Sequence, residues 1–501
     1  MLNNSPALIP LLLLSTAISI PVLAIKKTRL AYPIALAASL SAVLLSFYNI
    51  SRVWSDGAIP YHFGGWLPPI GIQYLLDPLS AFVTLALNVV AFVVLCHAGA
   101  VVDRELPGRE VPYYALALLL LCGANGMILT GDVFNLYVFL EIFSLAGYGL
   151  IGIGEKQASV ASFRYLIMGT VGASFYLLGV GFIYMVTGSL NMADLRNILP
   201  LVAGNPAVIV GLALIVIGLG IKMALFPLHG WLPDSYTYAA STSSALIAPL
   251  GTKVAAYVMI RILFFVFDAQ YVSRTLPITD LIAWLAAIGI IYGSVMAIAQ
   301  KEMKRMLAYS SVAQISYIGL GIGLANPLGF IGAVLHIMNH AFMKGALFLV
   351  AANLRNNSGH SDIARLDASF RKKLPWSMAA FTLAALSMIG LPPTAGFFSK
   401  WYLALAAIDK GKWLFLAVIL VSSLLNAVYF FRILEKVYLI PAAGQGDGKD
   451  LQSQAKGSLL GEEKWSLMVP ALVLSFSLLL LGLGNATLVK NVIQRIIPLG
   501  M

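Results

Sequence analysis

Four ionisable side chains lie deep inside apolar segments of the chain. Glu141 is in the middle of one apolar run, and Lys222, Lys253 and Lys400 lie within or next to others. A charge at the centre of a bilayer costs about 2.5–3.5 kcal/mol on insertion scales. One acid cannot neutralise three bases, so at least one lysine must be hydrated or uncharged part of the time. Because burial favours the uncharged amine, such a lysine is able to carry a proton. We therefore expect a proton relay.

A second group of ionisable residues has helical spacing. His336, His340 and Lys344 are separated by four residues each, which places them on one face of a helix. A neutral imidazole both accepts and donates a proton, so the two histidines can extend a relay. The alternative is that they only form hydrogen bonds between helices. The pair lacks the glutamate of an HExxH motif and a third ligand, so we expect no metal site.

Two proline-containing breaks must position these residues. Pro227 has no N–H for the carbonyl of Met223, and Pro392-Pro393 leaves the carbonyls of Met388 and Ile389 without their helical donors. Carbonyls at membrane depth must meet water, a side chain or an ion. We therefore expect water or a titratable side chain beside each break.

The composition excludes a soluble enzyme. Of 501 residues, 60% are hydrophobic and only 11% are charged, whereas soluble domains average about 25% charged. The net charge of +11 is then better explained by basic loops beside a membrane than by nucleic-acid binding. The two cysteines, Cys96 and Cys122, are too few to ligate an iron–sulfur cluster. We expect no cofactor in this chain.

Apolar stretches of about 20 residues, long enough to cross a bilayer, occur fourteen times. The sequence therefore predicts an all-α integral membrane protein of about fourteen transmembrane helices. The stretches lie near 5–24, 30–50, 75–100, 112–129, 131–152, 163–187, 206–225, 242–266, 276–299, 305–324, 327–353, 375–391, 411–434 and 465–486.

The distribution of Lys and Arg predicts the orientation. Loops after odd-numbered helices hold nineteen such residues, Lys304 among them, and the other loops hold seven. The basic loops are expected to be cytoplasmic, so both termini would lie outside the cytoplasm in a cell (plasma or inner) membrane. The polar segment Gly444–Lys456 is expected to be a loose cytoplasmic loop.

Four charged residues near helix ends have ordinary explanations. Arg261 and Arg432 are expected to extend their charged groups toward the membrane surface. Asp77 and Asp132 are expected to cap the N-termini of the helices that follow them.

A weak internal repeat links the two proline breaks. Residues Phe226–Trp231 align with Pro392–Phe397 at an offset of 166. Five helices separate the two broken helices, 7 and 12, and an odd repeat unit places the copies in opposite orientations. Paired interrupted helices indicate a transport site. We expect four units, namely 1–110 with helices 1–3, 111–268 with helices 4–8, 269–440 with helices 9–13, and 441–501 with a cytoplasmic loop and helix 14.

The motifs resemble a known family. Residues Ile221–Asp234 are similar to the broken helix 7 of the antiporter-like subunits of respiratory complex I and of Mrp-type cation/proton antiporters. Glu141 matches the helix 5 glutamate of that family, Lys253 its helix 8 lysine, and His336–Lys344 its helix 11 motif. Residues Ser387–Tyr402 most resemble the D subunit of Mrp antiporters, since the corresponding complex I subunit often carries glutamate where this chain has Lys400.

The resemblance implies a fourteen-helix subunit with two inverted five-helix repeats, acting with other membrane subunits and not as an enzyme by itself. It implies a proton-translocating subunit of a sodium/proton antiporter. Glu141 and Lys222 would form a gating ion pair, Lys253 would be the central carrier and Lys400 the exit-side carrier.

His336 and His340 would extend this relay, with His229, Lys344 and Asp234 as accessory residues. The alternative is a proton- or sodium-pumping subunit of a redox-driven complex, such as a membrane-bound hydrogenase or an NADH dehydrogenase. A membrane enzyme would need a clustered acid/base site at the interface, whereas these charges are spread along the middle of the membrane.

Overall fold

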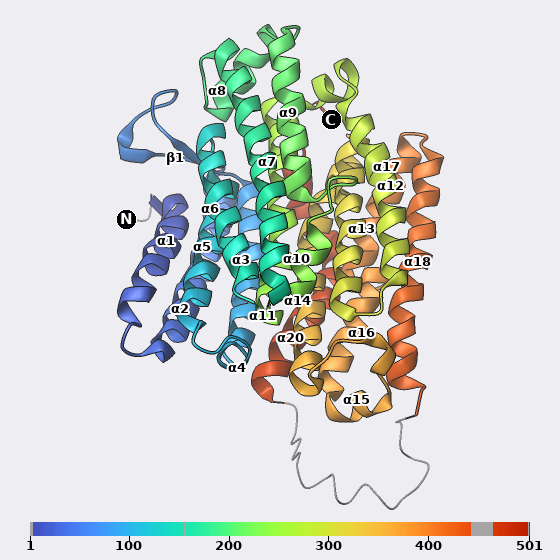
Figure 1. Cartoon of the computed structure of the whole chain (residues 1–501). Helices are drawn as coiled ribbons and strands as arrows, with labels where there is room; N and C mark the ends of the chain where they lie inside the picture. The colour runs from blue at the N-terminus through green and yellow to red at the C-terminus, as the bar shows by residue number, and fades with distance from the viewer. Residues whose placement is uncertain (1–3, 155, 442–463, 499) are drawn as a thin grey trace, which may run out of the picture.

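The computed structural model describes residues 4–154, 156–441, 464–498 and 500–501. The predicted loop Gly444–Lys456 lies outside these residues. The chain forms a bundle of long, roughly parallel helices (Figure 1). Thirteen helices of the described chain are long and apolar enough to cross a membrane, and the helices on either side of residues 390–394 make a fourteenth crossing. The prediction of a multi-pass membrane protein is confirmed.

The crossings follow the predicted stretches closely. They are α1 (Ser5–Leu23), α2 (Ala31–Asp56), α3 (Pro78–Ala98), α5 (Glu110–Leu129), α6 (Val133–Gly152), α7 (Lys156–Thr187), α9 (Pro206–Met223) with α10 (Leu232–Tyr238), α11 (Ser241–Ile260), α12 (Ile278–Ala299), α13 (Met303–Leu324), α14 (Pro327–Ser358), α16 (Pro375–Ile389) with α17 (Ala395–Asp409), α18 (Trp413–Tyr438) and α20 (Trp465–Leu483).

Short elements mark the two ends of the bundle. The antiparallel strands β1 (Ile59–His62) and β2 (Gln73–Leu76) lie toward the same end as α8 (Met192–Ile198), which we call the α8 end (Figure 1). Helices α4 (Val102–Glu105) and α15 (Ala368–Lys373) lie at the opposite end, the α4 end. Because α4 and α15 belong to loops after odd-numbered crossings, the α4 end is the strongly basic one.

Two helices run through the interior of the bundle. Every residue of α11 is buried, and α14 is buried from Gly329 to Leu354. These helices carry Lys253, His336, His340 and Lys344. Their charged groups therefore face protein and not lipid, as the cost of charge in hydrocarbon requires.

The two breaks have matching geometry. The residue after α9 is Ala224, whose φ is +58°, and the residue after α16 is Gly390, whose φ is +91°. The left-handed backbone at each position stops the helix. The two residues are 166 positions apart, the offset that the sequence motifs predict. The predicted interruption of crossings 7 and 12 is confirmed.

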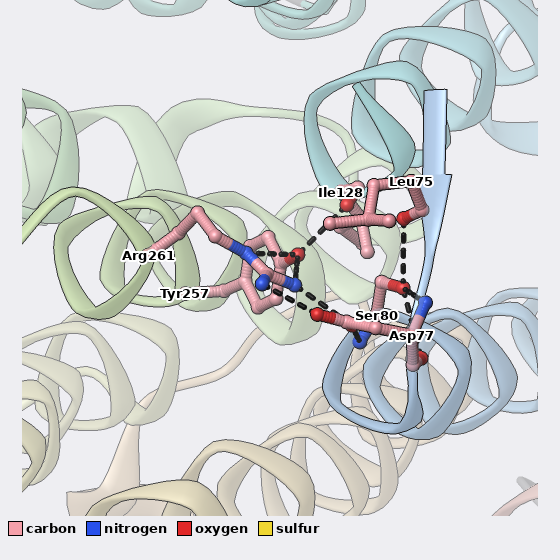
Figure 2. A network of polar contacts seen from close by, with 6 residues as sticks. All are labelled: Leu75, Asp77, Ser80, Ile128, Tyr257 and Arg261. Carbon is pink, nitrogen blue, oxygen red and sulfur yellow. Dashed lines mark hydrogen bonds and ion pairs between the residues drawn. The ribbon is translucent and has the colours of Figure 1, made fainter. Parts of the chain in front are cut away.

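The expectation that Arg261 extends toward the membrane surface is wrong. Its guanidinium is buried and donates hydrogen bonds to both carboxylate oxygens of Asp77, at 2.6 and 2.8 Å, and to the hydroxyl of Tyr257 (Figure 2). Asp77 caps α3 through the backbone N–H of Ser80, as predicted, and Asp132 caps α6. Asp77 lies just outside the membrane-spanning part of α3.

Burial alone would raise the pKa of the Asp77 carboxyl, but the charge and hydrogen bonds of Arg261 outweigh burial and lower it. This ion pair ties the strand hairpin to the end of α11. Lys304 also differs from the expectation of a loop residue, since it lies in the first turn of α13 with 1% of its surface exposed.

Candidate functional site

Lys400 meets the carbonyls that the second break leaves free. Its Nζ donates hydrogen bonds to the carbonyl oxygens of Met388 and Ile389 at 2.9 and 3.1 Å, and lies 4.9 Å from the centre of the Tyr317 ring. These are the two carbonyls predicted from Pro392-Pro393. The carbonyl dipoles at the C-terminus of α16 favour a nearby cation. Among the described residues, no carboxylate lies within 4.0 Å of this ammonium.

His336 of α14 lies next to Lys400, and His340 follows it one turn later. His336 Nδ1 is 2.9 Å from the hydroxyl of Ser399, the residue before Lys400. The rings of His336 and His340 are stacked with their centres 5.7 Å apart. Within the described part of the chain, His336 Nε2 and both ring nitrogens of His340 have no hydrogen-bond partner. Buried nitrogens of this kind normally bind a polar group or water, so these positions suit water.

Lys344 and Lys253 lie further along the same interior. Lys344 Nζ donates hydrogen bonds to the carbonyl of Leu307, at 2.7 Å, and to the hydroxyl of Ser310. Lys253 Nζ donates to the carbonyl of Ala248 at 2.6 Å and interacts electrostatically with Lys344 and His340. Both lysines are completely buried. Each ammonium is held by neutral oxygens and by no counter-ion among the described residues.

Glu141 and Lys222 form a looser pair than expected. Lys222 Nζ donates a hydrogen bond to Ser144 Oγ at 2.6 Å, and no ion pair joins it to Glu141 within 4.0 Å in the described residues. Ser144 lies one turn after Glu141 on α6, so it occupies the face between the two charges. The Lys222 ammonium still interacts electrostatically with the Glu141 carboxylate. Among the described residues, Glu141 Oε1 is buried and has no hydrogen-bond partner.

The accessory residues separate into two kinds. His229 lies in the first break, stacked on Phe226 at 5.5 Å between ring centres, with its Nδ1 buried and unpartnered. Asp234 accepts from Arg164 at 2.7 Å and lies 3.4 Å from Arg305. The Asp234 carboxylate therefore anchors α10 to α7 and α13.

Helix packing joins these groups into one row. Helix α9 packs on α11, α11 on α14, and α14 on α17. The row runs from Glu141 and Lys222 through Lys253 to the α14 residues and ends at Lys400. Sequence reasoning missed the hydroxyl partners Ser144, Ser310 and Ser399. Ser144 and Ser399 are predictable from their positions near Glu141 and Lys400 on the same helices. Ser310 lies on α13 while its partner Lys344 lies on α14, so no spacing in the sequence indicates that contact.

This fold and this row define a multi-pass membrane protein with a buried chain of titratable side chains. Residues 130–426 match the family described as NADH:quinone oxidoreductase/Mrp antiporter, transmembrane region. The chain belongs to this family.

The chain is similar both to a subunit named as an NADH-quinone oxidoreductase and to a subunit named as an antiporter. The chain is 48% identical to "NADH-quinone oxidoreductase subunit N" of Desulforudis audaxviator, over 87% of each chain. It is 31% identical to the D subunit of the Na(+)/H(+) antiporter of Alkalihalophilus pseudofirmus, over 86% of each chain. Its fold matches a chain of the Mrp complex from Dietzia with a TM-score of 0.86 and 27% identity, covering 98% of this chain and 96% of that one. The structural relative therefore belongs to a multisubunit membrane assembly.

Proposed function

We propose that this chain translocates protons through the row from Glu141 to Lys400. The observation that carries the proposal is that three buried lysines, Lys253, Lys344 and Lys400, are held by neutral carbonyl and hydroxyl oxygens. A buried ammonium without a counter-ion is easily converted to the neutral amine, and the neutral amine readily takes a proton back. The unpartnered nitrogens of His336 and His340 provide the intermediate positions between two of these lysines.

The proposed orientation places the α4 end in the cytoplasm. Its loops hold most of the Lys and Arg residues, and basic loops remain on the cytoplasmic side of a membrane. Both termini would then lie on the other side. The division into units 1–110, 111–268, 269–440 and 441–501 is part of the same proposal, and the matched breaks at Ala224 and Gly390 support the two inner units.

Two kinds of assembly fit a proton-translocating subunit. A monovalent cation/proton antiporter is favoured by Lys400 and its surrounding motif, which resemble the D subunit of Mrp antiporters. A redox-driven pump is favoured by the 48% identity to a relative named as an NADH-quinone oxidoreductase subunit. In either assembly the chain supplies the proton path and partner chains supply the driving reaction or the cation path.

Purification of the intact complex from its native membrane separates the two assemblies. Bound iron and co-purifying chains are measured on the same sample, which is then reconstituted in vesicles to follow a sodium-driven pH change. Sodium-dependent proton movement in an iron-free complex supports the antiporter. Iron–sulfur partners and no response to a sodium gradient support the redox-driven pump.

The row itself is tested in the same vesicles. Lys253→Ala and Lys400→Ala should each abolish proton translocation in an assembled complex. Wild-type proton movement in both variants would overturn the proposed path.

A further inference from the structure

Two side chains of opposite charge hold the junction between α10 and α11, at residues 239–240. Glu105, at the end of α4, accepts hydrogen bonds from the backbone N–H of Ser241 at 2.5 Å and of Thr242 at 3.1 Å, so its carboxylate covers the N-terminus of α11. Lys304 Nζ donates a hydrogen bond to the carbonyl of Ala239 at 2.6 Å, at the C-terminus of α10. An anion at a helix N-terminus and a cation at a helix C-terminus are both favourable placements.

A cavity adjoins this junction at the α4 end. Its volume is about 630 Å³, and its lining includes Glu105, Tyr238, Ala239 and Arg355. A second cavity of about 660 Å³ is also lined by Tyr238 and Arg355. Since the carbonyl of Ala239 binds Lys304, this buried ammonium lies directly behind the residues that line the first cavity. Both cavities have polar and charged linings, so they suit water.

Lys304 and the carbonyl that binds Lys344 belong to the same helix, α13. Lys344 Nζ donates a hydrogen bond to the carbonyl of Leu307, which follows Lys304 by three residues on α13. Residues with this spacing share a helix face and are about 4.5 Å apart along the axis. Lys304 therefore lies about one turn nearer to the α4 end of α13 than the carbonyl that holds Lys344.

We propose that Lys304 carries protons from the α4-end cavity to Lys344. In this step the Lys304 ammonium releases one proton, the neutral Lys344 amine takes one up, and a hydrated proton from the cavity then restores Lys304. The charged groups acting on Lys304 are Glu105 from α4, Arg355 from α14 and Glu302 at the start of α13. The inference rests on the proposed function and adds an entry residue that lies outside the row.

Three variants of the full complex test this role. Lys304→Met removes both the charge and the hydrogen bond to Ala239. Lys304→Arg keeps a positive charge and hydrogen-bond donors but cannot release a proton. Lys301→Met is the matched control, because Lys301 lies three residues earlier and its side chain is exposed. Assembly is checked on a native gel, and proton uptake is followed in vesicles with a pH-sensitive dye.

We expect the Arg and Met variants of Lys304 both to lose about 100-fold in proton translocation, at the lower end of what a positioned proton-transfer group contributes. The Lys301 variant should match wild type. Wild-type rates in Lys304→Arg would overturn the proposal, because the residue would then only cap α10. Lys400→Ala is measured in the same vesicles. An inactive Lys400 variant beside an active Lys304→Arg variant rejects the entry role alone, whereas activity in both rejects the proposed function as well.

Discussion

The ammonium of Lys400 lies 2.9 Å from the carbonyl oxygen of Met388, one of the carbonyls freed where α16 stops before Pro392-Pro393. A break in one helix thus supplies the oxygens that hold a buried cation on the next. The same carbonyls remain available to water whenever the lysine is neutral. The break and the lysine therefore form one unit, and several consequences can be measured.

Substitution of Lys400 distinguishes proton transfer from fixed charge. Arginine keeps the charge and most of the length but stays protonated at any working pH. We expect Lys400→Arg to fail almost as badly as Lys400→Ala, with a loss of about 100-fold in vesicle proton transport. If Lys400→Arg instead works like wild type while Lys400→Ala does not, Lys400 provides only charge and the relay ends elsewhere.

Glu141 should be required although it does not touch Lys222. Its buried carboxylate is the only acid expected in the row, and Ser144 connects its helix face to Lys222. Glu141→Ala should abolish exchange in everted vesicles while the complex still assembles. Glu435→Ala serves as the control, since Glu435 is exposed on α18. Full exchange by an assembled Glu141→Ala complex would remove the residue from the path.

The contact between His336 and Ser399 predicts a graded effect. Ser399→Ala removes one hydrogen bond of the imidazole, worth about 1 kcal/mol, so transport should fall by about fivefold. His336→Ala removes the proton-accepting ring itself and should cost considerably more. Equal transport in wild type and in His336→Ala would show that the ring only packs between helices.

Gly390 should be sensitive because of its place next to Lys400. A Cβ added at Gly390 would lie 3.0 Å from Lys400 Cδ, and the residue has a φ of +91°. Gly359 has a φ of +74° and open space around the same position. Both Gly→Ala variants bear the strain of left-handed backbone, about 1 kcal/mol. Transport should fall only in Gly390→Ala, and an equal effect in the two variants would contradict a role for contact with Lys400.

The ion pair between Asp77 and Arg261 should matter for stability. Arg261→Met leaves a buried carboxylate unpaired, which costs about 3–5 kcal/mol. Asp56→Asn disrupts the exposed pair of Asp56 with Arg52, a kind of pair worth about 0–1 kcal/mol. Thermal unfolding of the two purified variants gives the comparison. A melting temperature of Arg261→Met no lower than that of Asp56→Asn would contradict this ranking.

The pH dependence of this stabilisation follows from the pKa of Asp77, which is lowered in the folded protein. A depressed carboxyl pKa stabilises the fold at all pH values above the unfolded pKa of about 3.9. The contribution is lost only as the pH falls through the lower, folded value. In Arg261→Met the buried carboxyl of Asp77 has lost the partner that lowers its pKa, so burial raises that pKa and protonation relieves part of the penalty at lower pH. The difference in melting temperature between wild type and Arg261→Met should therefore be largest near pH 8 and should shrink as the pH falls.

Local sequence patterns predicted the crossings, the breaks and most of the row. Apolar length marks a membrane helix regardless of its neighbours, so the predicted stretches and the helices agree. Proline acts on its own segment, and the free carbonyls of Met388 and Ile389 followed from Pro392-Pro393 alone. The cost of charge in hydrocarbon makes Lys253 and Lys400 conspicuous within their apolar segments.

Which of these groups meet depends on how the helices pack. Lys304 has the sequence context of a loop lysine, and its burial depends on α10 ending against α13. Arg261 is near a helix end, yet Asp77, 184 residues earlier, holds it inside the protein. Lys222 contacts the hydroxyl of Ser144 on α6, 78 residues earlier, and among the described residues no ion pair within 4.0 Å joins it to Glu141. Such contacts depend on side-chain reach between helices distant in sequence, and no local pattern of residues encodes that distance.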